Sequence, residues 1–186
     1  METTYQSWID KGYEIFAQEG PQGIRVQKLA KAMGTSKSSF YHHFGDQESF
    51  IEMLLDEHQD RAEQYAAEVH RCETLVPGFV NLIIKYKIVI LFQRHLRRHR
   101  EKLDFQLVYQ QAGDVVNREI LGVWAQFMGI QSDMQLAKSL YTVIEDLFYE
   151  RLSEELLTYD WVAGLIYEIK SIVQGLITRK FARLRQ

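Results

Sequence analysis

Cysteine and proline are scarce in this sequence, and each shortage excludes a class of structure. The single cysteine, Cys72, excludes an internal disulfide framework and is typical of a protein kept in the reducing cytoplasm. Only two prolines, Pro21 and Pro77, interrupt the chain, and runs that alternate between apolar and polar residues are few. Helix is therefore the predicted structure of most of the chain, and we expect an all-α fold of about nine helices.

The sequence also has no apolar run long enough to cross a membrane. The longest one, Phe79–Phe92, contains Lys85 and Lys87 and is shorter than the roughly 20 residues that a spanning helix needs. The opening residues, Met1–Trp8, are polar and lack the basic and apolar regions of a signal peptide. We expect a cytoplasmic protein with no membrane partner, and its 46% hydrophobic content is enough for a sizeable core.

An excess of positive charge, which would favour nucleic-acid binding in general, is missing as well. The formal net charge is −3, and the first fifty residues hold five Lys and Arg against six Asp and Glu. Contact with phosphates normally needs positive side chains. Any DNA binding would therefore depend on a few placed residues and on the N-termini of helices.

One stretch, VQKLAKAMGTSKSSFYHHF at residues 26–44, predicts two short helices joined by a tight turn. Apolar residues from Val26 onward recur at i, i+3, i+4 and i+7, as on one face of a helix. Gly34 stands where a left-handed residue ends a helix, and Ser36 can cap the next helix. There Phe40 and Phe44 share the inner face, so the other face is free to enter a major groove. An ordinary helical hairpin without a partner is the alternative.

The flanking segments favour a small helical domain around this stretch. Thr4–Glu19 has an apolar stripe at helical spacing and ends at the breaker Gly20-Pro21-Gln22-Gly23. After the break at Gly45, Asp46 is a suitable N-cap for a long helix that reaches about His70. This last helix becomes strongly polar beyond its first turns, as expected of a helix that connects two domains.

Over about Trp8–Leu55, the segments WIDKGYEIFAQEG, VQKLAKAMGTSKSSFYHHF and FGDQESF together resemble the DNA-binding domain of the TetR family of transcriptional repressors. The resemblance implies a homodimer of all-helical subunits. It also implies a three-helix DNA-binding domain at 1–50, a connecting helix at about 46–70, and a C-terminal effector-binding and dimerisation domain at 51–186. Binding of a small-molecule effector would release the dimer from a pseudo-palindromic operator.

Carried over by position, nine residues resemble the family's DNA contacts: Arg25, Gln27, Ser36, Lys37, Ser38, Ser39, Tyr41, His42 and Gln47. Gln27 has the amide that suits adenine, Lys37 suits guanine or a phosphate, and Tyr41 suits backbone phosphates. The sequence departs from the family's pattern at Arg25, which replaces the usual Thr or Ser cap. It departs again at Thr35 and at the acidic segment Asp46-Gln47-Glu48, where a lysine is common. We therefore expect weaker or more selective DNA binding than in a typical member.

The rest of the chain predicts further helices at Phe79–Phe92, Lys102–Gly113, Asp114–Gly129, Gln135–Leu157 and Trp161–Leu184. The last two are amphipathic, with apolar surface left over for a second chain. The expected dimer residues are Leu136, Leu140, Val143, Leu147, Leu165, Ile169, Ile172 and Leu176. Aromatic residues expected to line an effector pocket are Tyr86, Tyr109, Trp124, Phe127, Tyr141 and Phe148, although each of them also fits a plain core position.

The cluster RHLRRHREK at Arg94–Lys102 is open to three interpretations. It is a second patch for nucleic acid or an anionic ligand, a metal site built on His95 and His99 at i and i+4, or a solvated helix end. No nucleophile elbow, phosphate-binding glycine loop or full metal-ligand set occurs, so neither enzyme activity nor a cofactor or metal is predicted. The main functional hypothesis is a ligand-responsive repressor. The alternative is a sensing module of the same fold with weak or lost operator binding.

Overall fold

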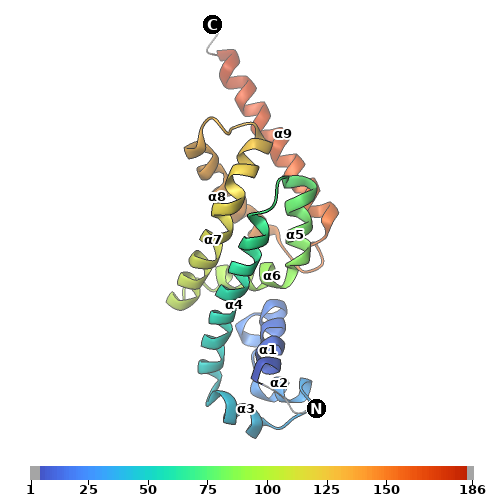
Figure 1. Cartoon of the computed structure of the whole chain (residues 1–186), viewed down its shortest axis with the longest axis vertical. Helices are drawn as coiled ribbons and strands as arrows, with labels where there is room; N and C mark the ends of the chain where they lie inside the picture. Colours follow the sequence, from blue (N-terminus) through green and yellow to red (C-terminus); the bar gives the residue numbers. More distant parts are fainter. Residues whose placement is uncertain (1–4, 184–186) are drawn as a thin grey trace. The chain divides into compact units, whose positions relative to one another are not determined.

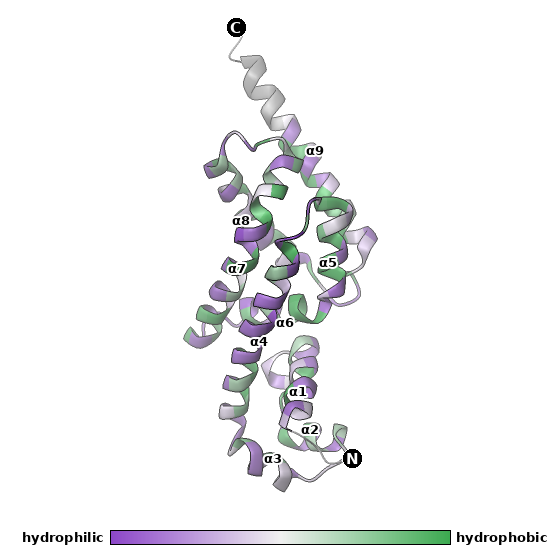
Figure 2. Cartoon of the chain, in the orientation of Figure 1, coloured by the Kyte–Doolittle hydropathy of each residue, from purple (hydrophilic) through white to green (hydrophobic). Residues whose placement is uncertain are grey.

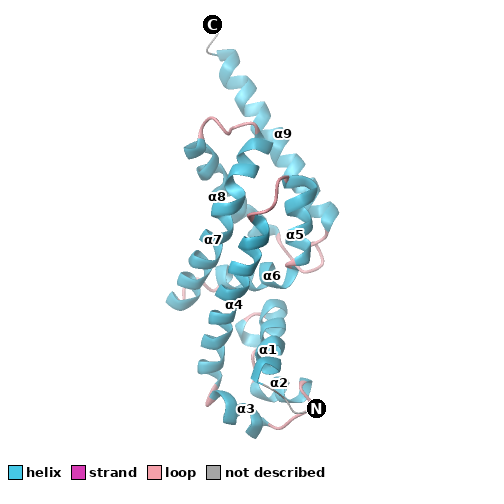
Figure 3. Ribbon diagram, in the orientation of Figure 1, coloured by secondary structure: helices cyan, strands magenta, loops and turns pink. Residues whose placement is uncertain are grey.

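The computed structural model describes the backbone of residues 5–183 and the side chains of residues 5–175, and this part consists of helices and loops alone (Figure 3). The predicted all-α class is therefore confirmed. Figure 1 follows the chain through its helices in order. Their bounds are α1 Tyr5–Glu19, η1 Pro21–Gly23, α2 Val26–Ala32, α3 Lys37–Phe44, α4 Gln47–Val69, η2 Leu75–Phe79, α5 Val80–Lys85, α6 Lys87–Arg98, α7 Leu103–Met128, α8 Met134–Arg151 and α9 Tyr159–Arg183.

The chain forms two compact units, each assembled from two segments of sequence. The first unit comprises Met1–Gln64 and Tyr86–Val115, and the second comprises Tyr65–Lys85 and Val116–Gln186. The predicted DNA-binding domain 1–50 lies inside the first unit, which also contains α6 and the first half of α7. The predicted functional boundary near residue 50 stays a prediction.

Aromatic packing of α1 against α6 forms the centre of the first unit. The Phe92 ring on α6 stacks on Phe16 at 4.0 Å and on Tyr13 at 4.4 Å between ring centroids. All three side chains are fully buried or nearly so. Because α1 also packs against α2 and α3, this core holds the predicted helix-turn-helix on a fixed support.

The second unit is built around the second half of α7, α8 and α9. Trp124, Met128 and Val162 are almost completely buried there. Trp124 meets Tyr141 edge-on at 5.5 Å, and Phe148 on α8 contacts Trp161 on α9 at 5.8 Å. These contacts join the three helices into one layered core.

The single helix predicted for Phe79–Phe92 is wrong, because the segment contains two helices. It includes α5 and the first half of α6, which meet at Tyr86, where φ is −95° and ψ is 26°. Apolar residues, drawn green in Figure 2, occur on both helices. The apolar residues of α5 are buried in the second unit and those of α6 in the first. The pattern that resembled one helix buried all round therefore came from two short helices with separate buried faces.

Two other predicted boundaries are also wrong. The break at Ala112-Gly113-Asp114 does not exist, since α7 continues from Leu103 to Met128. One glycine within a helix costs only about 1 kcal/mol relative to alanine, which is too little to end a well-packed helix. The helix predicted to reach Leu157 ends at Arg151. There Ser153 Oγ accepts a hydrogen bond from the Leu156 backbone N–H, which favours a turn over another helical turn.

Within the described residues, no single helix has both the length and the apolar character needed to cross a membrane. The segments Leu75–Lys85 and Lys87–Arg98, bent by 79° where they meet, satisfy that test only when they are taken together.

Candidate nucleic-acid interface

The turn between α2 and α3 has the conformation that its sequence predicts. Gly34 has φ of +64°, and its N–H donates to the carbonyl of Lys31. The Thr35 N–H donates to the carbonyl of Ala30, which completes a paired C-terminal capping arrangement. Ser36 then caps α3, because its hydroxyl accepts from the Ser39 N–H at 3.3 Å. Both predictions, the left-handed glycine and the serine cap, are confirmed.

The inner face of α3 is aromatic and buried. Phe40 contacts Trp8 at 5.5 Å and Phe50 at 5.1 Å between ring centroids, and Phe44 contacts Phe50 at 4.7 Å. Phe40 is 0% exposed and Phe44 is 4% exposed. The rings tie α3 to α1 and to the start of α4, so the direction of its opposite face is set by the core.

The opposite face of α3 is polar and open to solvent. Lys37, Ser38, Tyr41 and His42 are exposed, and Tyr41 keeps 50% of its surface accessible. Ser39 is half-buried, and its N–H donates to the Ser36 cap. The exposed side chains include a cation and several hydrogen-bond donors, which are the groups that contact phosphates and base edges. Their role as DNA contacts stays a prediction.

Helix α2 adds a second set of exposed groups. Gln27 and Arg25 are exposed, and Arg25 occupies the N-cap without a side-chain cap bond. Its guanidinium Nε donates instead to the carbonyl of Gln22 at 3.2 Å. Lys31, which the sequence prediction did not include, is also exposed, one turn after Gln27. The i, i+4 spacing of Gln27 and Lys31 was the signal that could have identified it.

The start of α4 is acidic, as the sequence indicates. Asp46 caps this helix, with its carboxylate accepting from the Ser49 N–H at 2.8 Å. That hydrogen bond holds the pKa of Asp46 below its ordinary value. Gln47 and Glu48 are both exposed. Asp46 and Glu48 thus place two acidic side chains where a phosphate contact would be expected, and affinity must come from α2 and α3.

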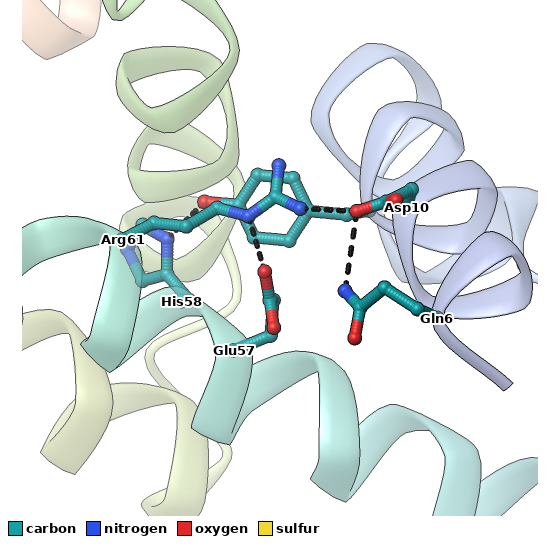
Figure 4. A network of polar contacts seen from close by, with 6 residues as sticks. Gln6, Asp10, Glu57, His58 and Arg61 are labelled. Atoms are coloured by element: carbon teal, nitrogen blue, oxygen red, sulfur yellow. Dashed lines mark hydrogen bonds and ion pairs between the residues drawn. The ribbon is translucent and has the colours of Figure 1, made fainter.

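A polar network supports α1 behind this surface (Figure 4). Arg61 on α4 forms ion pairs of 2.6 Å with Asp10 on α1 and with Glu57 on its own helix. Its guanidinium also lies 4.1 Å from the centroid of the Tyr13 ring. The Tyr13 hydroxyl in turn lies 2.7 Å from His58 Nδ1. Sequence reasoning missed this network, because its members are far apart in the chain.

The predicted pocket residues are divided between the two units. Tyr86 and Tyr109 belong to the first unit and are half-buried. In the second unit Trp124 is buried, and the other three predicted residues, Phe127, Tyr141 and Phe148, are half-buried. The Tyr141 hydroxyl donates to Asn117 Oδ1 at 3.1 Å, and the Asn117 amide donates to the Glu145 carboxylate. This group combines aromatic and polar atoms, as an effector site requires, and stays a prediction.

The basic cluster surrounds the C-terminal end of α6. His95 is buried, and His99, the C-cap residue, is half-buried. Burial lowers the pKa of His95 to about 4, and the neighbouring Arg94 contributes to this shift. Among the described residues, no group of three or more His, Cys, Asp and Glu is arranged to hold a metal ion. Cations in the last turn, including Arg97 and Arg98, oppose the helix dipole as in the interpretation of a solvated helix end.

Several predicted dimer residues lie on the surface of the single chain. Leu136, Val143 and Leu147 on α8 are 39%, 58% and 49% exposed, and Ile172 on α9 is 57% exposed. Leu140, Leu165 and Ile169 are half-buried. The side chain of Leu176 lies outside the described residues. Large apolar side chains with this exposure leave a face that a second chain can cover.

Comparisons with known proteins support the interpretation of the N-terminal part. The family model described as "Bacterial regulatory proteins, tetR family" matches residues 9–54. The uncharacterized HTH-type transcriptional regulator YwcC of Bacillus subtilis is 33% identical over 58 residues, which are 31% of this chain and 26% of that protein. The HTH-type transcriptional repressor AcnR of Corynebacterium glutamicum is 32% identical over 63 residues, 34% of each chain.

The chain thus matches between 26% and 34% of the length of these curated relatives. A crystal structure of a tetR-family transcriptional regulator from Streptomyces coelicolor has the same fold over a longer range. It superposes with a TM-score of 0.54 at 17% identity, covering 95% of this chain and 87% of that chain. The matched residues 9–54 contain the capped helix-turn-helix described above. Over residues 9–54, the chain therefore has an N-terminal domain similar to that of the tetR family of bacterial regulatory proteins.

Proposed function

We propose that this protein is a dimeric, ligand-responsive transcriptional regulator that represses by binding a pseudo-palindromic operator. The proposal rests on the two different faces of α3. Its aromatic face is buried in the core, and its polar face, with Lys37 and Tyr41, is exposed to solvent. A helix held in this way can enter a major groove while its support stays rigid.

The dimer and the effector complete the proposal. A second copy would cover the exposed apolar residues of α8 and α9 and place two recognition helices on successive half-sites. A small molecule bound among the aromatic residues of the second unit would favour a dimer whose helices no longer match the operator. Such an effector acts only through different affinities for the two states.

The acidic start of α4 favours one other function. Asp46 and Glu48 are exposed acidic residues where phosphate contact is expected, so a sensing module with weak or lost operator binding is the second candidate. It shares the fold and differs only in DNA affinity. The test below separates the two.

A binding measurement decides between these functions. Duplexes selected by the protein from a random-sequence pool are titrated by gel shift or fluorescence anisotropy over a series of salt concentrations. We expect sequence-selective binding whose affinity falls as salt rises, because phosphates release counterions when cations contact them. Absence of any sequence-selective complex at low salt would exclude the repressor and leave the sensing module.

Variants then locate the interface. The double substitution Lys37→Ala/Tyr41→Ala removes one cation and one exposed hydroxyl from α3 and is expected to weaken binding at least tenfold. Arg71→Ala removes a positive charge from an exposed position in the loop after α4, outside the proposed DNA and dimer interfaces, and serves as the control, with affinity unchanged. Equal behaviour of the two variants would show that α3 is not the DNA-contacting helix.

A further inference from the structure

A chain of three hydrogen bonds, two of them buried and the third partly buried, links four helices inside the first unit. The Tyr13 hydroxyl on α1 lies 2.7 Å from His58 Nδ1 on α4. His58 Nε2 lies 2.8 Å from Gln93 Oε1 on α6. The Gln93 amide Nε2 donates to the backbone carbonyl of Tyr109 on α7 at 2.8 Å. We call this chain, from Tyr13 to the Tyr109 carbonyl, the relay.

The relay has only one possible direction when His58 is neutral. A backbone carbonyl can only accept, so Gln93 must point its NH₂ group at Tyr109 and its carbonyl oxygen at His58. His58 Nε2 must then carry the proton, which leaves Nδ1 as an acceptor. Tyr13 must therefore donate its hydroxyl proton to His58. The carbonyl on α7 thus determines, through two side chains, the orientation of a hydroxyl on α1.

Burial keeps the relay in this state. His58 is 0% exposed and Gln93 is 4% exposed. Burial lowers the pKa of His58 to about 4, with the nearby Arg61 adding to the shift, so the ring is neutral at neutral pH. Burial also raises the pKa of Tyr13, which keeps its donating proton. The His58 ring stacks on Phe92 at 4.4 Å, so it has little freedom to turn.

Charged groups beside the relay also join α1 to α4. The Arg61 guanidinium on α4 lies 4.1 Å from the centroid of the Tyr13 ring. It forms ion pairs with Glu57 on its own helix and with Asp10 on α1 (Figure 4). Helices α6 and α7 contribute only neutral groups to the relay, namely the Gln93 amide and the Tyr109 carbonyl. The position of α1 therefore depends on its aromatic packing against Phe92 of α6, on an exposed ion pair with α4 and on the relay. The relay adds polar contacts that run from α1 through α4 to α6 and α7.

We propose that the relay couples α6 and α7 to α1, and that His58 and Gln93 are positioning residues for the helix-turn-helix. The inference rests on the proposed function, since its consequence is a change in DNA affinity. A shift of α6 or α7 that separates Gln93 from either partner leaves buried polar atoms unpaired. The strain is relieved by movement of α1, which supports α2 and α3.

The direction of the relay is tested by the ¹⁵N chemical shifts of the His58 ring in the full-length protein. The wild type should show a protonated Nε2 and an unprotonated Nδ1. In Gln93→Leu the acceptor for Nε2 is lost, so the proton should move to Nδ1 and donate to the Tyr13 oxygen. In Tyr13→Phe the proton should stay on Nε2. A wild-type ring protonated on Nδ1, or a tautomer change in Tyr13→Phe, would overturn the proposal.

The coupling is tested by hydrogen exchange, which needs no DNA. Amide protons of α1 should exchange at least about fivefold faster in Gln93→Leu than in the wild type, while those of α9 stay unchanged. Gln111→Leu is the matched control, because it removes the exposed 2.6 Å hydrogen bond that Gln59 donates from α4 to α7 outside the relay. Equal exchange in α1 for Gln93→Leu and Gln111→Leu would refute the coupling. Tyr13→Phe, which keeps its ring, supplies the same comparison if Gln93→Leu does not fold.

DNA affinity gives the final comparison. Gln93→Leu and Tyr13→Phe should each weaken binding to the selected duplex at least about fivefold. The double variant should lose less than the product of the two, because both side chains act through His58. If the folded double variant loses affinity by the full product of the two single losses, the two side chains act independently and the relay is refuted. If the wild type itself binds no DNA, the proposed function fails, and the exchange and ¹⁵N results still decide the relay.

Discussion

Arg25 is expected to lower the stability of α2 and to raise the affinity for DNA. It holds the N-cap position of α2 in an extended conformation, with φ of −127° and ψ of 123°, and makes no side-chain cap bond. Serine there would accept from a free N–H of the first turn, as serine does at many helix starts. The arginine leaves that N–H without a cap and presents a cation beside Gln27.

Arg25→Ser is therefore expected to raise the free energy of unfolding by about 1 kcal/mol and to lower DNA affinity. The salt dependence of binding should also become shallower by about one ion, because one phosphate contact is lost. Urea unfolding and an anisotropy titration over several salt concentrations measure the two effects. Arg25→Ala, which removes the cation without adding a cap, is the control. A serine variant that binds as tightly as the wild type would show that Arg25 does not touch phosphate.

Gly20 is constrained both by its backbone and by its neighbours. Its φ is +77° and its ψ is −172°, a region that only glycine adopts easily. A Cβ at this position would lie 2.7 Å from His95 Nδ1 and 2.9 Å from Gln22 Oε1. Gly20 thus allows α6 to pack against the end of α1.

Gly20→Ala should consequently lower the free energy of unfolding by about 2 to 3 kcal/mol, from backbone strain and from displacement of His95. Gly34→Ala, at φ of +64° with open space around it, should lower it by only about 1 kcal/mol. Chemical denaturation of both variants measures the difference. Equal losses would mean that contact with His95 adds nothing.

At the scale of helices, the sequence predicted caps well and long-range partners poorly. Gly34, Ser36 and Asp46 were identified because each acts on groups within four residues of itself. The bend at Tyr86 was missed, because all-round hydrophobicity cannot separate one buried helix from two short ones. Tyr13 and His58 are 45 residues apart, and His58 and Gln93 are 35 apart. No local pattern reports such a contact.

Two histidines buried where α1, α4 and α6 pack together predict how the free energy of unfolding depends on pH. The pKa values of His58 and His95 are lowered from 6.5 to about 4 in the folded chain. The unfolded chain therefore takes up protons near pH 6.5 that the folded chain refuses until about pH 4. Stability from these two residues is complete above pH 6.5 and is lost progressively as the pH falls toward 4. Each contributes a slope of up to about 1.4 kcal/mol per pH unit.

Urea unfolding at several pH values between 4.5 and 7.5 measures this slope. His58→Gln and His95→Leu each remove one histidine that titrates only in the unfolded chain. Each variant should therefore show a smaller change of the free energy of unfolding with pH over this range. Carboxylates with lowered pKa values, such as Asp46, add to the slope in all variants alike. The difference between each variant and the wild type therefore isolates the histidine. A slope that stays the same in both variants would contradict the assignment of neutral, buried rings.

At the scale of the whole molecule, the helical class and the helix-turn-helix could be predicted, whereas the two-unit organisation could not. Periodicity reports which face of a helix is apolar, and it placed Lys37 and Tyr41 on the exposed face correctly. It does not report which other segment covers the apolar face. For that reason α6 was not assigned to the unit that holds the helix-turn-helix.

The proposed dimer gives a prediction that separates an apolar interface from ordinary exposed residues. Val143 and Leu147 are 58% and 49% exposed in the single chain, so substituting them should not disturb its core. In a twofold dimer each substitution occurs twice, and each buried apolar side chain contributes about 1.5 to 3 kcal/mol. Val143→Glu/Leu147→Glu should therefore convert the dimer to monomers at micromolar concentration, with an unchanged helical circular dichroism spectrum. Sedimentation velocity measures the mass.

Leu103→Glu is the matched control for this experiment. Leu103 is 67% exposed, more than either residue of the double variant, but it begins α7 in the first unit, whereas the α8 and α9 residues proposed for the interface belong to the second. It should leave the dimer intact. Dissociation by Leu103→Glu alone, or a double variant that still sediments as a dimer, would place the interface elsewhere. If the double variant becomes a monomer, its DNA affinity should fall too, because one recognition helix then reads one half-site without the second.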